Sequence, residues 1–277
     1  MKKQMTFRTV VDVPRMEFLV QPCEKMLLVG SCFADNIGQC LRREAFPVTV
    51  NPYGVMYNPV SVRHTIEKTD FDGRIVFITL GTNHVYVLKE TGEVVDNCQK
   101  RPQSLFQETA LDVDECYASL AWTVKLLRER RPDVLVVVTV SPIRYAKYGY
   151  HGSALSKATL LLAADRLVKA FPQQVNYFPA YEIVNDELRD YRFYAPDMLH
   201  PSQQAVEYIW QRLVDCCFSE EARQYMDEWL PLREALGHRP FDAESEAYQS
   251  FRAATLEKVR MMQKKYPAMQ IDFETKE

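Results

Sequence analysis

The stretch VLVVVTV at residues 134–140 carries the most information about the fold. Nearly every residue in it is β-branched or aliphatic, which predicts a strand, and Ser141-Pro142 ends the run. A strand that is apolar at every position must be covered on both faces, as the central strands of parallel sheets are. The stretch therefore predicts an α/β protein with a mostly parallel central sheet.

Shorter apolar runs on either side of this stretch alternate with segments of helical periodicity. Residues 84–95 alternate in polarity and turn at Thr91-Gly92, which predicts a hairpin. An alternating β/α series favours a sheet with helices on both sides. The predicted strands span residues 26–29, 46–50, 75–80 and 175–178, and the predicted helices span residues 32–43, 112–129, 156–171 and 202–218.

The pattern changes after Phe218. Residues 220–236 and 243–266 predict two charged amphipathic helices, joined by GHRP at 237–240, and contain no predicted strand. We therefore expect a sheet domain at residues 1–218 that carries the chemistry. Residues 219–277 are expected to form a helical extension that packs on this domain or makes a contact between subunits.

Composition and charge exclude several classes of function. The chain has 277 residues, 47% of them hydrophobic, and a formal net charge of −3. These values are typical of a soluble globular protein and argue against binding to nucleic acid or to an anionic membrane. No apolar run has the length of a membrane span, and no apolar segment follows Lys2-Lys3 as a signal peptide would require.

The cysteines indicate a reducing compartment. Seven are scattered along the chain, an odd number that forms no disulfide framework, and no C-x-x-C pair suggests a structural zinc. We therefore expect a cytoplasmic protein with no metal site.

Ser31 is the first candidate for chemistry. In open α/β sheets, ligands bind at the carboxyl ends of the strands, and Ser31 follows the strand predicted at 26–29 and begins the next predicted helix. Backbone N–H groups near such a position can hold an oxyanion. A serine at this junction also suits an ordinary helix N-cap. Both roles remain open from position alone.

A serine nucleophile needs a base, and His200 is the strongest candidate among the five histidines. It lies in YAPDMLHPS at residues 194–202, directly before a predicted helix, with Asp197 three residues earlier. One turn of chain at this spacing places the carboxylate beside the imidazole. There it can hold the ring tautomer and stabilise the imidazolium that forms when the ring accepts the serine proton. The alternative is a helix-entry loop in which Asp197 only accepts bonds from backbone amides.

These two signals, in this order, resemble the SGNH (GDSL-like) hydrolase superfamily. The closer resemblance is to the bacterial GSCFA family, because LVGSCFA at residues 28–34 is similar to the motif that names it. The resemblance covers about residues 5–235. Further similar stretches lie at residues 51–54, 57–59, 139–144 and 156–158, and in the long run from 177 to 202.

The resemblance implies a three-layer α/β/α sandwich and a catalytic triad of Ser31, His200 and Asp197. It also implies an oxyanion hole built from the Ser31 amide, the Gly54 amide and an asparagine side chain. Asn83, just after the strand at 75–80, fits the asparagine position, and Asn97, beyond the predicted hairpin, is the competing donor. Losing one such donor costs about 10²–10³ in rate.

The chain departs from the superfamily pattern at two positions. The superfamily usually has Asp before its serine, where this chain has Gly30. It usually has Asn-Asp after the third strand, where this chain has Asn83-His84. Neither departure removes a member of the expected triad.

Arg144, Tyr194 and Cys32 can each be interpreted as a functional or as a structural residue. Arg144 and Tyr194 would suit a sugar ring or an anionic acyl donor beside a cleft. The alternatives are a surface ion-pair partner for Arg144 and a clamp on the His200 loop for Tyr194. Cys32 is a rival nucleophile, since helix N-termini activate thiolates. Because it follows Ser31 on the same turn, we expect its side chain to point into the core.

Residues and resemblance together predict a serine esterase of SGNH type. It would remove O-acyl groups, such as acetyl, from a carbohydrate or glycoconjugate, with no metal or organic cofactor. Three alternatives remain: O-acyl transfer to a sugar, a non-catalytic carbohydrate- or protein-binding module, and a scaffold that assembles through its C-terminal helices. The expected partner is a small-molecule or carbohydrate ester rather than nucleic acid or membrane, and the C-terminal helices are a candidate contact for a homo-oligomer.

Overall fold

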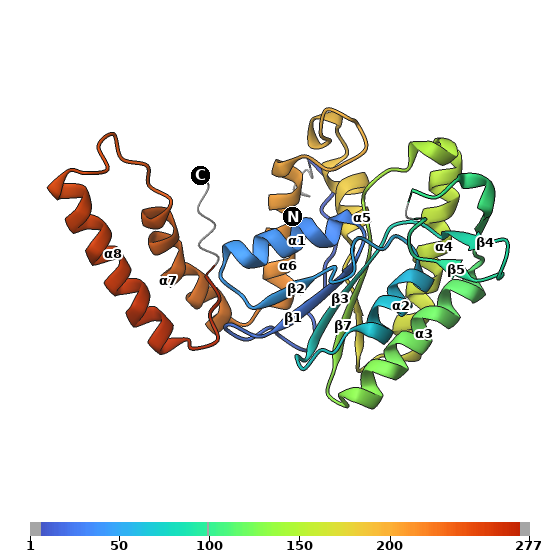
Figure 1. The fold of residues 1–277 in the computed structure, drawn as a ribbon, viewed down its shortest axis with the longest axis horizontal. Helices are drawn as coiled ribbons and strands as arrows, with labels where there is room; N and C mark the ends of the chain where they lie inside the picture. The colour runs from blue at the N-terminus through green and yellow to red at the C-terminus, as the bar shows by residue number, and fades with distance from the viewer. Residues whose placement is uncertain (1–6, 99, 272–277) are drawn as a thin grey trace, which may run out of the picture.

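A five-stranded parallel sheet forms the centre of the computed structural model, which describes residues 7–98 and 100–271 (Figure 1). Its order is β2–β1–β3–β7–β8, and every neighbouring pair is parallel. The apolar run that predicted a central strand is β7, which pairs with β3 on one side and β8 on the other. The prediction of a parallel sheet is confirmed. The strands are β1 (Met26–Gly30), β2 (Val48–Val50), β3 (Ile75–Leu80), β7 (Leu135–Val140) and β8 (Val175–Tyr177).

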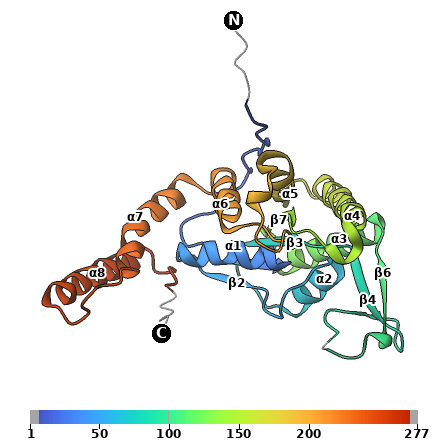
Figure 2. The ribbon, with the colours of Figure 1, turned by 90° about the horizontal axis from the view of Figure 1, so that it is seen from above.

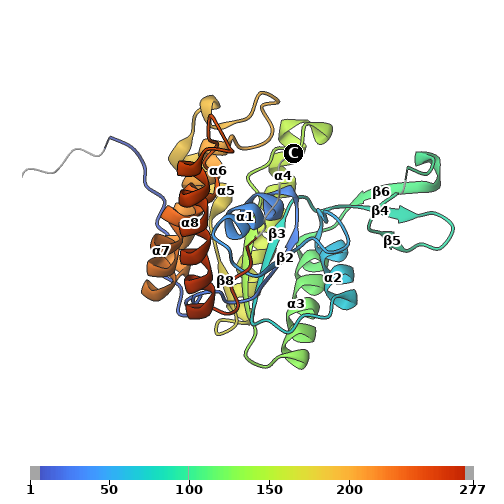
Figure 3. The same cartoon turned by 60° about the vertical axis from the view of Figure 1, so that its left-hand side comes forward.

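Alternate residues of the strands face two different helical layers. In β1, Met26 and Leu28 belong to one buried cluster, whereas Leu27 and Val29 belong to the other. Both faces of the sheet are therefore covered, which is why the strands are apolar throughout. The expected three-layer α/β/α sandwich is the fold observed (Figure 3). One layer holds α1 (Cys32–Arg43) and α6 (Gln203–Cys217), and the other holds α2 (Pro59–Lys68), α3 (Val113–Arg130) and α4 (Gly149–Ala170).

Polar caps determine where several helices begin. Ser31 caps α1, and Ser202 caps α6 by accepting a hydrogen bond from the Ala205 amide. Helix α4 begins at Gly149, earlier than the predicted start at Ser156. The glycines in this stretch argue against helix, but its first turns pack onto the body, where the buried Ser153 accepts a hydrogen bond from the Tyr145 amide at 3.2 Å.

A second, antiparallel sheet projects from the body beyond α2 and α4 (Figure 3). It has the order β5–β4–β6, with β4 (His84–Leu88), β5 (Val94–Val95) and β6 (Phe106–Ala110). The predicted hairpin at 84–95 is confirmed as β4 and β5. Strand β6 was not predicted, because only Phe106 of its sequence FQETA is buried and its polar residues carry no strand signal.

Short turns connect β8 to α6 and build the loop that holds His200. They are α5 (Ala180–Glu182), a π-helical turn at Ile183–Leu188 and a 3₁₀ turn at Tyr191–Phe193. Two further 3₁₀ turns span Gln103–Leu105 and Ala146–Tyr148. The chain in this region stays close to the carboxyl end of β7, since the Arg144 amide donates to the Leu199 carbonyl at 3.1 Å.

The C-terminal helices α7 (Glu220–Leu236) and α8 (Glu246–Lys265) form a hairpin beyond α1 and α6 (Figures 1 and 2). Helix α7 packs on the end of α1: Tyr225 is fully buried and its hydroxyl donates to the Glu44 carbonyl at 3.0 Å. The Trp229 indole donates to the Arg43 carbonyl at 2.9 Å. Side chains from both helices thus extend the core on the α1 face of the sheet.

The helices and the cysteines of the described residues can be compared with what the sequence predicts. No helix within residues 7–98 and 100–271 is both long enough and apolar enough to cross a membrane. The seven cysteines are all free thiols.

Candidate functional site

Ser31 lies at the carboxyl end of β1 and at the start of α1, as expected from its position in the sequence. Its side chain is fully buried, and its Oγ lies 3.1 Å from Thr79 Oγ1 in β3. The same Oγ accepts a hydrogen bond from the Phe33 amide at 3.3 Å, so Ser31 is the N-cap of α1. The capping role is therefore real, and it does not exclude chemistry at the same oxygen.

Gly30 explains one departure from the superfamily pattern. Its φ is +144°, and a Cβ there would overlap the carbonyl oxygen of Thr79. In this structure a side chain at the position before Ser31 would therefore collide with the backbone of β3. The Gly30 amide donates to Asn51 Oδ1 at 2.9 Å, which links the end of β1 to the loop that follows β2.

His200 and Asp197 form the predicted pair. His200 Nδ1 lies 2.6 Å from Asp197 Oδ2, while Asp197 Oδ1 accepts the amides of Leu199 and His200 at 2.9 and 3.0 Å. These bonds, the His200 amide first, lower the pKa of Asp197 to about 2. Because an ionised carboxylate only accepts, Nδ1 carries a proton, and the neutral form of such a ring has its lone pair on Nε2. The arrangement orients a base, and the two side chains are 46% and 45% exposed, so substrate can reach them.

Hydrogen bonds from Arg144 hold the His200 loop at the carboxyl edge of the sheet, where Ser31 also lies. The Arg144 guanidinium donates to the Met198 carbonyl at 3.1 Å, in addition to the backbone bond between Arg144 and Leu199. Arg144 follows β7, and Ser31 follows β1. In the sheet these two strands are separated only by β3. Ser31 and His200 therefore occupy the same carboxyl edge of the sheet.

The triad is not closed in this structure. Ser31 Oγ contacts Thr79 and the Phe33 amide, the His200 ring is bonded to Asp197, and no hydrogen bond links Ser31 to His200 within the described residues. The structure brings His200 and Asp197 into contact and leaves the Ser31 hydroxyl turned toward β3.

The three predicted oxyanion donors each bond to a backbone carbonyl in this structure. The Ser31 amide donates to Thr79 O at 2.9 Å, which continues the β1–β3 ladder. The Gly54 amide closes a turn onto Asn51 O at 2.8 Å. Asn83 Nδ2 donates to Leu111 O at 2.6 Å. The Ser31 and Gly54 amides and one N–H of the Asn83 side chain are therefore bonded to backbone carbonyls in the conformation described.

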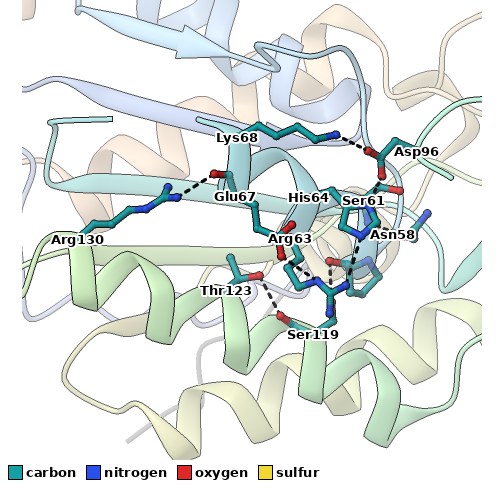
Figure 4. A network of polar contacts seen from close by, with 11 residues as sticks. Asn58, Ser61, Arg63, His64, Glu67, Lys68, Asp96, Ser119, Thr123 and Arg130 are labelled. Atoms are coloured by element: carbon teal, nitrogen blue, oxygen red, sulfur yellow. Dashed lines mark hydrogen bonds and ion pairs between the residues drawn. The ribbon is translucent and has the colours of Figure 1, made fainter. Parts of the chain in front are cut away.

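Asn97, the competing donor, follows Asp96, whose side chain bonds to α2. Its neighbour Asp96 accepts from His64 Nδ1 at 2.7 Å and from Lys68 Nζ at 3.4 Å (Figure 4). Helix α2 starts near Ser31, because the Tyr57 carbonyl before it accepts the Gly81 amide, and then runs away from the carboxyl edge. Asp96 therefore bonds to the later turns of α2, on which His64 and Lys68 lie.

Arg144 and Tyr194 come together beside the His200 loop. The Arg144 guanidinium carbon lies 5.0 Å from the centre of the Tyr194 ring and 4.6 Å from that of Tyr150. Arg144 and Tyr194 line one open pocket of about 250 Å³, together with Val184, Asn185, Arg189, Asp190 and Tyr191. The two residues singled out as candidate substrate contacts thus share a pocket.

Lys157 is a buried residue near Ser31 that the sequence reasoning did not single out as a site residue. Its Nζ donates to the carbonyls of Gly81 and Ser141 at 2.6 and 2.7 Å, joining the ends of β3 and β7. Burial lowers its pKa to about 7. Its position in the helix could have indicated that it is buried. Ser153, Ser156 and Leu160 are buried in α4, and Lys157 lies among them.

Cys32 is a poor rival to Ser31. Burial raises the pKa of its thiol, so the thiolate that would act as nucleophile is disfavoured. Its side chain is partly buried and packs against the core on the α1 face of the sheet, in agreement with the expectation that it points into the core.

The fold and the site define a three-layer α/β/α protein with a serine at the end of its first strand. The chain belongs to the GSCFA family, whose sequence model matches residues 25–74 and 70–213, more than half of the chain. A separate model, described as the C-terminal domain of GSCFA domain proteins, matches residues 229–277. No curated protein matches the chain.

Several solved structures are similar at low identity. A GDSL-like lipase from Bacteroides thetaiotaomicron has 13% identity and a TM-score of 0.46, over 76% of this chain and 92% of its own. A catalytic mutant of an acetylxylan esterase from Geobacillus stearothermophilus has 13% identity and a TM-score of 0.46, over 72% and 97%. A carbohydrate esterase family 3 protein from Talaromyces cellulolyticus has 11% identity and a TM-score of 0.40, over 74% and 99%. At such values the fold assignment rests on the strand order and connections given above.

Proposed function

We propose that this protein is a serine esterase in which Ser31 is the nucleophile and His200 the general base. The observation that carries the proposal is the Asp197–His200 pair at 2.6 Å, held at the same sheet edge as Ser31. A neutral histidine whose Nδ1 proton is held by an ionised carboxylate has its lone pair on Nε2, which is what a base for a serine hydroxyl requires. Its exposure to solvent lets an ester approach from the same side.

The reaction begins with movement of the serine. Because Ser31 Oγ is buried against Thr79, its side chain rotates away from β3 toward His200 as the ester enters. His200 then accepts the hydroxyl proton while Oγ attacks the acyl carbon. The tetrahedral intermediate expels the alcohol, which takes the proton from His200. Water, deprotonated by the same imidazole, hydrolyses the acyl-enzyme and restores Ser31.

A carbohydrate O-acyl ester is the proposed substrate class. The open pocket beside the His200 loop presents Tyr191 and Tyr194 together with Arg144 and Arg189. Aromatic faces pack against the apolar side of sugar rings, and guanidinium groups donate to hydroxyl and acyl oxygens. A short acyl group such as acetyl suits a serine with so little space around it.

Hydrolysis of p-nitrophenyl acetate and of an acetylated methyl glycoside tests the proposal. We expect turnover by the wild type and a loss of about 10³-fold or more in kcat for Ser31→Ala. Ser219→Ala is the matched control, because Ser219 is also a buried N-cap and accepts the Ala222 amide at 3.1 Å. Each substitution removes one cap, at about 1 kcal/mol of stability, and only the first should abolish turnover. Equal activity in the two variants would refute the assignment of Ser31.

A further inference from the structure

The Tyr145 hydroxyl is a buried donor beside Ser31. No hydrogen-bond partner for it exists among the described residues. A Cβ added at Gly81 would lie 3.3 Å from Ser31 Cβ and would overlap the Tyr145 hydroxyl oxygen. The missing side chain of Gly81 therefore leaves room in which the hydroxyl approaches the serine. Buried hydroxyl groups are normally hydrogen-bonded, so an unpaired one at a candidate site calls for a functional reason.

The ring that carries this hydroxyl is held in place from several directions. The Tyr145 amide donates to Ser153 Oγ at 3.2 Å, and Lys157 Nζ lies 5.0 Å from the centre of the ring. Lys157 is itself fixed by the Gly81 and Ser141 carbonyls. The Tyr57 ring meets Tyr145 edge-on, with centres 6.1 Å apart. The hydroxyl is therefore positioned by packing rather than by a bond of its own.

We propose that the Tyr145 hydroxyl donates the hydrogen bond that stabilises the oxyanion formed on Ser31. This inference rests on the proposed esterase function. When Ser31 Oγ bonds to the acyl carbon, the carbonyl π bond breaks and its electron pair moves to oxygen, which accepts a hydrogen bond from the phenol. No proton is transferred to or from Tyr145, and the bond is released when the carbonyl re-forms. Tyrosine side chains are among the groups that serve in this way.

Tyr145 supplies a donor at a site where the other candidate donors are already bonded to backbone carbonyls. The Ser31 and Gly54 amides and Asn83 Nδ2 are bonded to backbone carbonyls, whereas the Tyr145 hydroxyl has no such competitor. Lys157 acts as a positioning residue, because it holds the ring and the Gly81 carbonyl without reaching the substrate. A preorganised donor costs no reorganisation during the reaction.

Tyr145→Phe tests the proposal, with Tyr57→Phe as the matched control. Tyr57 is a neighbouring ring in contact with Tyr145, and its side chain is exposed. We expect kcat for p-nitrophenyl acetate to fall about 10²–10³-fold in Tyr145→Phe, with KM nearly unchanged. Tyr57→Phe should keep wild-type kcat. A trifluoromethyl ketone, which forms a tetrahedral adduct on serine, should lose affinity for Tyr145→Phe in the same ratio as kcat/KM.

The melting temperature separates this role from a structural one. Removing a hydroxyl that has no partner should leave the melting temperature of Tyr145→Phe equal to or above that of the wild type. A lower melting temperature or failure to fold would show that the hydroxyl has a structural partner and would overturn the proposal. Equal kcat in the two variants, or faster turnover in Tyr145→Phe, would overturn it while leaving the esterase function intact. Absence of turnover in the wild type would overturn both.

Discussion

The Asp197 carboxylate accepts three hydrogen bonds. It thereby holds both the backbone of the loop and the ring of His200. One oxygen takes the amides of Leu199 and His200, and the other takes His200 Nδ1. Both contacts expected from the D-x-x-H spacing, to the loop amides and to the imidazole, are therefore made by the same side chain. Because these bonds lower its pKa to about 2, Asp197 stays ionised across the pH range in which an imidazole titrates.

Lys157 should make the free energy of unfolding depend on pH. Burial lowers its pKa from 10.5 to about 7, so between these values the unfolded chain binds a proton that the folded chain has lost. The free energy of unfolding should therefore rise with pH from 7 toward 10.5, by on the order of 1 kcal/mol per unit from this group.

Urea denaturation at several pH values across this window measures the contribution of Lys157. Lys157→Met should lack the part of the slope that comes from the lysine. Lys169→Met is the control, because Lys169 is an exposed residue of the same helix paired with Asp165, and it should keep the wild-type slope. Parallel curves for the wild type and Lys157→Met would contradict the prediction.

At the scale of elements, the junction of β1 and α1 fixes the position of Ser31. Gly30 ends the strand with φ +144° against the Thr79 carbonyl, and Ser31 then caps the helix. The strand and the helix were both predictable from apolar periodicity, and α1 and α7 have the bounds that the sequence indicates. This junction is a local feature, and local sequence therefore reveals it.

Gly30→Ala should be severely destabilising. The methyl group meets a backbone carbonyl and the residue must keep a positive φ, so we expect a loss of about 3 kcal/mol or more in the free energy of unfolding. Gly92→Ala is the control, because Gly92 also has positive φ, +74°, but has open space around its Cβ position. That variant should lose only about 1–2 kcal/mol. Similar losses in both, measured by chemical denaturation, would show that the contact with Thr79 is unimportant.

Features that depend on distant contacts could not be predicted in the same way. The orientation of Asn83 depends on the Leu111 carbonyl, 28 residues away. The polar strand β6 forms only because β4 pairs with it. The unpaired hydroxyl of Tyr145 depends on the room left by Gly81. The common edge of Ser31 and His200 was predictable from the rule for parallel sheets, whereas the direction in which Ser31 Oγ points depends on packing.

At the scale of the whole molecule, the C-terminal helices and the sheet domain share a core. Tyr225 of α7 packs against Phe46 with ring centres 5.3 Å apart and against Tyr266 at 4.8 Å. Its hydroxyl reaches carbonyls at the end of α1. This contact joins the two parts of the chain that the sequence separates at Phe218.

Tyr225→Ala should destabilise the whole protein. Truncating a fully buried aromatic residue costs about 3–5 kcal/mol, and because the core is shared we expect one cooperative transition in both wild type and variant. Phe251→Ala on α8 is the control, since Phe251 is 44% exposed and should cost far less. Calorimetry that resolves two transitions, with only one of them shifted by Tyr225→Ala, would contradict the shared core.

Identification of the residue modified by a fluorophosphonate is the most direct measurement of the central claim. Such reagents phosphonylate a serine that a neighbouring base activates. Peptide mass spectrometry of the labelled wild type should find one adduct, on Ser31. Labelling should be lost in His200→Gln and strongly slowed in Asp197→Asn, in proteins whose melting temperatures show that they are folded. An unlabelled folded wild type, or an adduct on Ser31 that forms equally fast without His200, would contradict the account.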